Sequence, residues 1–202
     1  MESEKSSFSI RRIEATHINP GSFGEIHKQA DPGSVWACFR VNELSALMYE
    51  TFRRNGVGSA IVAESEIGEL LGYFIVSSRS KQIQPTFESI SPTRLASVFF
   101  RIFFHPKLIV RTLLYVLVRR IAIQKFGNVQ FEIISFMVKP TAQSQGIGTS
   151  MIQAYFQEQK GQKVVVITNG IHSKRFYERN GFQVMAGRQF CKQQVFLLMG
   201  PD

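Results

Sequence analysis

The sequence predicts an α/β (α+β) protein in which strands and helices follow one another along most of the chain. Two runs of strand-forming residues, 59–64 and 69–77, are joined through Gly68 and are typical of a β-hairpin. A further strand pattern, 131–138, passes through a glycine-containing loop into a helical pattern. The continuous β-branched run 163–169 predicts a strand that is buried on both faces.

The composition indicates a globular protein, and we expect residues 1–202 to form one domain. Apolar residues make up 44% of the 202 residues and charged residues 19%, which is typical of folded chains. Cys38 and Cys191 are too few for a framework of disulfides, so we expect free thiols in a reducing compartment. The polar N-terminus lacks the features of a signal peptide. These features predict a cytoplasmic protein.

The net charge of +9 is typical of proteins that bind nucleic acid, an anionic membrane or an acidic ligand. No zinc-ligand spacing, helix-turn-helix pattern or aromatic RNA-binding motif accompanies it. We therefore expect no nucleic-acid partner and no metal.

The N-terminal elements are predicted in the order strand, helix, helix. Residues 8–14 alternate between apolar and polar and predict the first strand. Asn19 and Pro20 start a short helix, and a turn follows at 31–34. Apolar residues then recur at helical spacing over 42–56.

Residues 91–124 form a basic, apolar segment that predicts two helices interrupted at His105-Pro106. Between Glu88 and Glu132 there are seven basic residues and no acidic one. A transmembrane span is excluded because no window of eighteen residues is free of charge. Three interpretations stay open: a helical pair packed over the sheet, a peripheral helix in the plane of a membrane surface, and a homodimer interface.

The most informative motif, Gln143-x-x-Gly146-x-Gly148, lies where strand 131–138 passes into a helix at 148–160. The first N–H groups of a helix lack partners within the helix, and the helix dipole favours negative charge there. Glycine lets a phosphate approach the backbone closely because it has no Cβ atom. The motif alone predicts either a phosphate site or an ordinary turn.

A second motif, Phe176-Tyr177-Glu178-Arg179-Asn180-Gly181-Phe182, favours the phosphate site. It belongs to a predicted helix, 173–180, in which Gly181 takes the left-handed position after the last turn. Strands are predicted beyond it at 182–186 and 193–199.

Together the two motifs resemble the acyl-CoA-binding motif and the following helix motif of the GCN5-related N-acetyltransferase (GNAT) superfamily. Thirty residues separate Gly146 from Phe176, which matches the family spacing. The resemblance covers roughly 131–182 and is weaker over the N-terminal third. It implies the GNAT fold, a mixed and mostly antiparallel central sheet of about seven strands flanked by helices, with 91–124 as a helical insertion.

The resemblance also implies acetyl-CoA (coenzyme A) as the co-substrate. The loop and helix start would hold its pyrophosphate through backbone N–H groups. The N–H of Met137 or Val138 would polarise the thioester carbonyl. The residues implied in co-substrate binding are Phe136, Met137, Val138, Gln143, Ser144, Gln145, Gly146, Ile147, Gly148, Thr149, Asn169, Ser173 and Phe176.

The resemblance assigns Tyr177 the role of the acid that protonates the departing thiolate. A tyrosine that packs under the co-substrate without giving a proton is the alternative interpretation. Its neighbour Phe176 is expected to face the core. Glu132, six residues before Val138, matches the base of the histone-acetyltransferase branch. A solvated strand end is the alternative interpretation of this glutamate. His27 is the other candidate base, because an imidazole titrates near neutral pH. Phe23 and His27 are expected beside the acceptor.

The chain departs from the family pattern at the loop. Relatives commonly have Arg and then Gly at the positions of Gln143 and Ser144. Lys139 and Gln145 are the candidates to compensate for the missing cation.

A second departure concerns the turn before the Phe-Tyr helix. Asn169 lies eight residues before Tyr177, where relatives have an Asn at seven. Either this turn has one extra residue or Asn169 does not contact the co-substrate. Ser173 is the candidate cap of the helix.

The leading functional hypothesis is an acetyl-CoA-dependent N-acetyltransferase that acts on a primary amine of a small molecule. The N-terminal layout resembles a bacterial subgroup that often occurs with surface-polysaccharide genes, which implies an amino sugar as the acceptor. The alternatives are a protein or peptide N-acetyltransferase and a non-catalytic acyl-CoA-binding module associated with a membrane.

Overall fold

The computed structural model describes residues 7–32, 49–50, 53, 58–78, 110, 117, 131–159, 161–190 and 193–201. Most of the predicted helix 42–56 and of the insertion 91–124 lies outside these residues. So do both cysteines and the last two residues of the turn at 31–34. The predictions made for those parts stay predictions.

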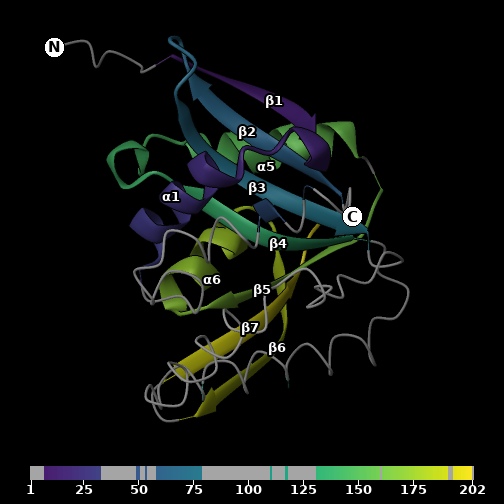
Figure 1. Ribbon diagram of the computed structural model, residues 1–202. Helices are drawn as coiled ribbons and strands as arrows, with labels where there is room; N and C mark the ends of the chain where they lie inside the picture. Colours follow the sequence, from purple (N-terminus) through teal and green to yellow (C-terminus); the bar gives the residue numbers. More distant parts are fainter. Residues whose placement is uncertain are drawn as a thin grey trace, which may run out of the picture. The chain divides into compact units, whose positions relative to one another are not determined.

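Seven strands form one mixed sheet in the order β1-β2-β3-β4-β5-β7-β6 (Figure 1). The elements are β1 (Phe8–Glu14), α1 (Pro20–Ala30), β2 (Ser59–Ser65), β3 (Leu70–Ser78), β4 (Phe131–Val138), α5 (Ile147–Glu158), β5 (Val164–Asn169), α6 (Ile171–Arg179), β6 (Gln183–Phe190) and β7 (Gln193–Met199). The pairs β1–β2, β2–β3, β5–β7 and β7–β6 are antiparallel, whereas β4 and β5 are parallel. The predicted α/β class and seven-stranded mixed sheet are confirmed.

The chain divides into two compact units, which are described separately. The first unit comprises residues 1–77 and 134–160, and the second comprises 78–133 and 161–202. Strand β4 contributes its first three residues to the second unit and the remaining five to the first.

In the first unit, helices cover both faces of the hairpin β2–β3. Tyr73 of β3 stacks on Phe23 of α1, with ring centroids 4.1 Å apart. The next residue, Phe74, meets Tyr155 of α5 edge-on at 5.6 Å. Because successive side chains of a strand point to opposite faces, α1 and α5 lie on opposite sides of β3, as Figure 1 shows. Asn19 caps α1 by accepting hydrogen bonds from the N–H groups of Gly21 and Ser22.

In the second unit, β7 lies between β5 and β6, and its Val195 and Leu197 are completely buried with Val165 of β5. Helix α6 packs against these three strands. The buried run Val164–Val166 confirms the prediction from its β-branched sequence. Strand β6 is longer than the predicted 182–186, because its pairing with β7 continues to Phe190 opposite Gln193.

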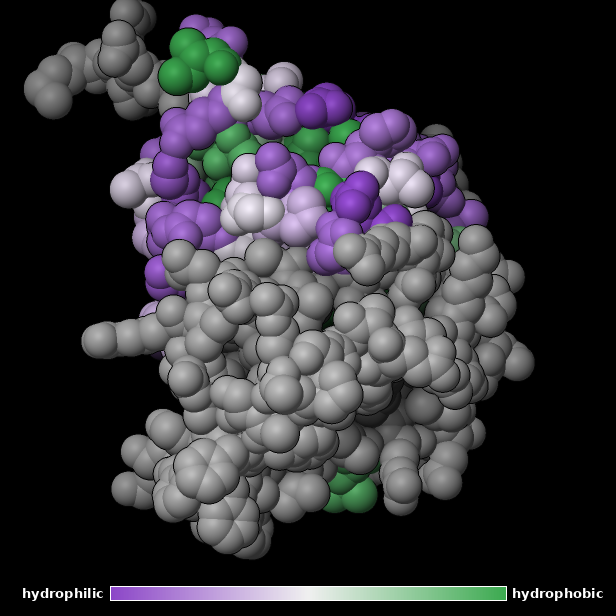
Figure 2. Space-filling view, viewed as in Figure 1, coloured by the Kyte–Doolittle hydropathy of each residue, from purple (hydrophilic) through white to green (hydrophobic). Residues whose placement is uncertain are grey.

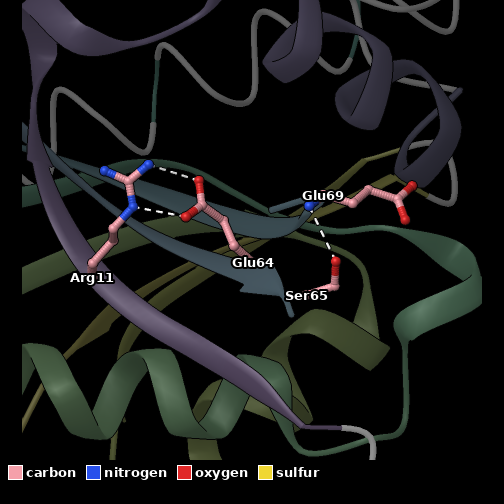
Figure 3. Close-up of polar contacts among 4 residues, drawn as sticks. All are labelled: Arg11, Glu64, Ser65 and Glu69. Carbon is pink, nitrogen blue, oxygen red and sulfur yellow. Dashed lines mark hydrogen bonds and ion pairs between the residues drawn. The ribbon is translucent and has the colours of Figure 1, made fainter. Parts of the chain in front are cut away.

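Edge strand β1 is joined to β2 by a bidentate ion pair (Figure 3). Nε and Nη2 of Arg11 each lie 2.7 Å from a carboxylate oxygen of Glu64. Figure 3 also shows Ser65, whose Oγ accepts the Glu69 N–H at 3.1 Å and closes the β2–β3 turn. The Arg11 guanidinium lowers the pKa of the Glu64 carboxyl.

Replacing this carboxylate is expected to weaken the fold in a pH-dependent way. Because the folded-state pKa of Glu64 is lowered, the stabilisation is present above its ordinary value of 4.5 and is lost as the pH falls through the folded value. Glu64→Gln should reduce the free energy of unfolding at pH 7 by about 0.5–1 kcal/mol, since the arginine is largely exposed. Urea unfolding at pH 7 and pH 3 measures this difference, and 1 M salt is the control that should shrink it. A difference of equal size at pH 3 would contradict the ion-pair explanation.

The described surface of the first unit is mainly hydrophilic, with a hydrophobic projection where Figure 1 draws the β2–β3 turn (Figure 2). Ile67 lies in that turn and is 89% exposed. No helix among the described residues is long and apolar enough to span a bilayer.

Candidate functional site

The loop between β4 and α5 is held in shape by its own glutamines. Gln143 donates from Nε2 to the carbonyl of Val138 at 3.0 Å, and Gln145 donates to the carbonyl of Thr141 at 3.2 Å. Both bonds close the loop onto itself around a short 3-10 turn at Pro140–Ala142. Gln143 thus stabilises the backbone that leads into α5.

The start of α5 has the properties of an anion-binding site. Its N-cap is Gly146, with a φ of 80°, and no side chain of the described residues caps the first turn. A Cβ atom built on Gly146 would meet nothing within 4 Å, so the backbone stays open to a ligand. The N–H groups of Ile147, Gly148 and Thr149 belong to the first turn, which intrahelical bonds leave unpaired. This end of α5 therefore fits the pyrophosphate of a nucleotide-type ligand.

Ser144 has a backbone conformation that favours glycine, the residue that relatives commonly have at this position. Its φ is 65°, which makes it the one non-glycine residue with positive φ in the described part of the chain. A residue with a Cβ atom pays roughly 1–2 kcal/mol for this conformation, whereas glycine does not. The serine thus holds a left-handed conformation at some cost in stability.

The two candidates to replace the missing cation are already engaged. The ammonium group of Lys139 forms an ion pair with Glu69, and Gln145 holds the carbonyl of Thr141. Compensation for the missing cation by either side chain stays a prediction. The backbone at the start of α5 stays the predicted place of the anion contacts.

The end of β4 presents two different faces. The ring centroids of Phe136 and Phe74 are 5.5 Å apart, so Phe136 lies on the face of the sheet that α5 covers. Ser135 bonds to Tyr49 on the opposite side, and by alternation Met137 shares that face. A Cβ on Gly72 of β3 would lie 3.0 Å from the Met137 carbonyl, so β3 and the end of β4 approach closely.

Phe23 and His27, the predicted acceptor residues, lie together in a buried polar cluster of the first unit. His27 Nδ1 is 2.7 Å from the Tyr49 hydroxyl, which is hydrogen-bonded to the Tyr73 hydroxyl and lies 3.0 Å from Ser135 Oγ. Tyr73 donates to the Phe23 carbonyl at 3.1 Å. All five residues are buried.

Tyr49, Tyr73 and Ser135 also belong to this cluster, and the motifs did not predict them. They lie on a helix and on two strands that are distant in sequence. For the two tyrosines, an aromatic residue within an apolar run is the signal that the sequence offers. Desolvation raises the pKa of Tyr49 and Tyr73, so both phenols keep their protons at neutral pH.

Tyr177 is a buried side chain of α6 in the second unit, only 4% exposed. Its ring meets Phe176 and Phe182 edge-on at 5.3 and 5.1 Å. Burial in these apolar surroundings raises the pKa of the phenol. The group is therefore protonated at neutral pH, as a proton donor must be.

The residues around Tyr177 differ from expectation in two respects. Phe176 is only half-buried, so Tyr177, not Phe176, faces the core. Helix α6 starts at Ile171 with Gly170 as its N-cap, and Ser173 is its third residue. The prediction that Ser173 caps the helix is therefore wrong. The turn from Asn169 at the end of β5 contains only Gly170, whose φ of 79° favours glycine.

Glu132 is buried, with 5% exposure, and it lies opposite Val165 of β5 in the parallel register. The alternative of a solvated strand end is therefore wrong. A buried carboxylate is costly in a fold and marks a candidate for function. Among the residues that the structure describes, no group of three metal-ligating side chains could hold a metal ion.

Comparison with known proteins agrees with this arrangement. Residues 111–184 match the family model of the acetyltransferase (GNAT) domain. No curated protein gives a significant match. The polyamine N-acetyltransferase of Drosophila melanogaster has a similar structure, with a TM-score of 0.61 at 12% identity, covering 96% of this chain and 99% of its own. A GNAT-family protein of Desulfovibrio desulfuricans gives 0.59 at 12% identity, covering 96% and 98%. The N-acetyltransferase of Staphylococcus aureus Mu50 gives 0.57 at 13% identity, covering 95% and 99%.

Residues 111–184 match a GNAT acetyltransferase domain, and the fold is that of solved GNAT acetyltransferases. The domain match over residues 111–184 and the shared fold agree with the resemblance that the motifs indicate. Enzymes of this superfamily use acetyl-CoA as the co-substrate. The acceptor is a separate question.

Proposed function

We propose that the protein transfers the acetyl group of acetyl-CoA to a primary amine of a small molecule. The observation that carries this proposal is the start of α5, where a glycine with open space precedes a first turn without a side-chain cap among the described residues. Such a terminus suits the pyrophosphate of coenzyme A. Coenzyme A supplies the activated thioester, and the chain supplies binding and proton transfer.

The proposed reaction uses one acid and one base of this chain. The amine nitrogen attacks the thioester carbonyl, a C–N bond forms, and the C–S bond breaks. Glu132 takes the proton that the amine nitrogen loses, and Tyr177 gives its phenolic proton to the departing thiolate. Solvent then restores both groups. The backbone N–H of Met137 or Val138 stabilises the developing oxyanion.

The raised pKa of Tyr177 does not exclude it as the acid. Desolvation disfavours every anion, and a thiolate that leaves into a dry site becomes more basic for the same reason. The proton transfer therefore depends on the difference between two groups that are shifted in the same direction.

For the acceptor we propose an amino sugar, following the resemblance of the N-terminal layout to a surface-polysaccharide subgroup. The further predictions of a cytoplasmic location, and of membrane or homodimer contact through residues 91–124, belong to the same hypothesis. A panel of amino sugars, polyamines and peptides separates the small-molecule acceptor from the protein or peptide alternative.

Gly146→Ala tests the pyrophosphate site, with Gly68→Ala as the matched control. Both glycines have positive φ, of 80° and 76°, and both have open space around them. Each substitution therefore costs about 1 kcal/mol of stability. At Gly146 the methyl group should also obstruct the ligand and raise the Kd for acetyl-CoA about 10-fold, measured by calorimetry.

Equal co-substrate affinity in the two variants would contradict the assignment of the α5 terminus. Binding of acetyl-CoA by the wild type without turnover of any amine would favour the non-catalytic module instead. Turnover with peptides alone would overturn the small-molecule acceptor but not the acetyl transfer.

A further inference from the structure

The outward side of α6 carries a row of exposed basic side chains. His172, Arg175 and Arg179 are all exposed and belong to this one helix. Their spacing of three and seven residues brings them within an arc of about 60° and spreads them over about 10 Å along the helix axis. They therefore form one strip, which we call the α6 strip.

The charges of the α6 strip are not balanced by acidic residues of the second unit. The acidic residue of the helix, Glu178, lies 2.9 Å from Nζ of Lys174. Glu132, the other acidic residue that the structure describes in this unit, is buried. The ion pairs of the described residues use other cations of the chain, so both guanidinium groups of the strip remain open to an anion.

Apolar side chains border the α6 strip on both sides. Ile171 precedes Arg175 by four residues and is 39% exposed. Phe176 follows His172 by four residues and is half-buried. Residues four apart are neighbours on a helix surface, so an exposed isoleucine adjoins an exposed arginine. This combination is typical of a helix at the boundary between lipid headgroups and acyl chains.

This composition favours an anionic membrane over other anionic partners. Small ligands bind in concave sites that bury most of their surface, whereas the α6 strip is the exposed side of a helix. Nucleic acids and acidic proteins would attract the arginines but give the exposed Ile171 no role. A bilayer of anionic lipids offers phosphates to the arginines and hydrocarbon to the isoleucine in the same surface.

We propose that the α6 strip and Ile171 dock the protein on an anionic phospholipid surface. Arg175 and Arg179 pair with headgroup phosphates, because a guanidinium group binds phosphate oxygens through two parallel N–H donors. Ile171 enters the boundary of the acyl chains. Tyr177 faces the core of the second unit, so the docking surface does not include it. The inference concerns a part of the chain other than 91–124, and it does not depend on acetyl transfer.

Vesicle sedimentation of the full chain tests the arginines. The wild type should bind vesicles of mixed phosphatidylglycerol and phosphatidylcholine at low salt, and it should not bind phosphatidylcholine alone. Arg175→Gln combined with Arg179→Gln should lower the partition coefficient about 30-fold, because each basic residue near such a surface contributes about 1 kcal/mol. A wild type that does not bind the anionic vesicles overturns the proposal.

The matched control is Arg11→Gln combined with Arg12→Gln. It removes the same net charge from two exposed arginines of β1, which form ion pairs with Glu64 and Glu158. We expect this variant to bind the anionic vesicles nearly as the wild type does. An equal loss in the two double variants would mean that net charge alone governs binding, and it would overturn the role of the α6 strip.

Ile171→Ser tests the apolar contact, with Val184→Ser as its control. Val184 lies on β6 and is 40% exposed, which nearly equals the exposure of Ile171. Loss of the exposed part of an isoleucine side chain from the acyl boundary should weaken vesicle binding about 3-fold. The change on β6 should have no effect. Equal binding by Ile171→Ser and the wild type would contradict insertion of this residue.

Two further measurements separate lipid from other anions. The Kd for acetyl-CoA and the rate of acetyl transfer to a soluble amine should be the same in Arg175→Gln/Arg179→Gln as in the wild type. A higher Kd for acetyl-CoA with unchanged vesicle binding would assign the strip to the co-substrate phosphates and overturn the proposal. Binding of polyglutamate or an oligonucleotide in place of vesicles would overturn it as well. Circular dichroism checks that each variant is folded.

Discussion

Tyr177→Phe is expected to lower kcat for acetyl transfer by roughly 100-fold while leaving the affinity for acetyl-CoA nearly unchanged. The substitution removes the phenolic proton and keeps the ring that packs between Phe176 and Phe182. A general acid contributes about 10²–10⁴ to the rate, and the loss appears in kcat because the proton moves in the transition state. An assay of thiol release measures kcat, and calorimetry measures the Kd for acetyl-CoA.

Tyr155→Phe is the matched control for this substitution. Tyr155 is also a buried tyrosine on a helix, and burial raises its pKa to about 12. Its hydroxyl has no hydrogen-bond partner among the described residues, so its removal costs little. We expect kcat of Tyr155→Phe to equal that of the wild type. An equal kcat in Tyr177→Phe would exclude the phenol as the acid.

The raised pKa of Tyr177 also sets the pH dependence. The phenol acts in its protonated form, and burial moves its pKa upward from the ordinary value of 10.0. At any pH below about 10 the phenol should therefore stay protonated, and its titration should not affect kcat. A decline of kcat at neutral pH that disappears in Tyr177→Phe would contradict this assignment.

The largest loss of stability is expected from Gly58→Ala, at the start of β2. Gly58 has a φ of +86°, and a Cβ atom there would lie 1.9 Å from the carbonyl oxygen of Val76. The neighbour is backbone of β3, which cannot rotate away, so the strands must separate. We expect a loss of at least about 3 kcal/mol, the sum of the left-handed conformation and the clash. Thermal unfolding should show a decrease in Tm of roughly 6–12 °C.

Gly68→Ala separates the two contributions, because Gly68 has a similar φ of +76° and no atom within 4 Å of its Cβ position. It should lose only about 1 kcal/mol. If both variants lost the same free energy, the contact with Val76 would carry no cost and only the φ angle would matter.

Local patterns were sufficient to predict most of the described elements. The alternation over 8–14 and the β-branched run 163–169 predict β1 and β5 within one residue of their observed bounds. Asn19 with Pro20 marks the start of α1, and the glycine motif marks the start of α5. In each case the signal is a backbone preference or a capping group, which acts over a few residues.

The wrong or incomplete predictions concern contacts between distant segments. Strand β6 extends to Phe190 because β7 pairs with it, not because residues 187–190 have a strand pattern. Ser173 is a good capping residue, yet Gly170 with its positive φ starts α6 earlier. Phe176 is the more apolar neighbour, but the orientation of α6 against β5, β7 and β6 buries Tyr177 instead.

The sequence by itself determined the order of the elements, the glycine loop before α5 and the superfamily that its motifs resemble. It did so because capping, turn formation and strand alternation depend on residues close together in the chain. Only the tertiary structure decided that Glu132 and Tyr177 are buried and that His27 bonds to Tyr49. Tyr49 and Ser135 are separated by 86 residues, and a hydrogen bond over that distance exists only after the sheet and its covering helices have packed.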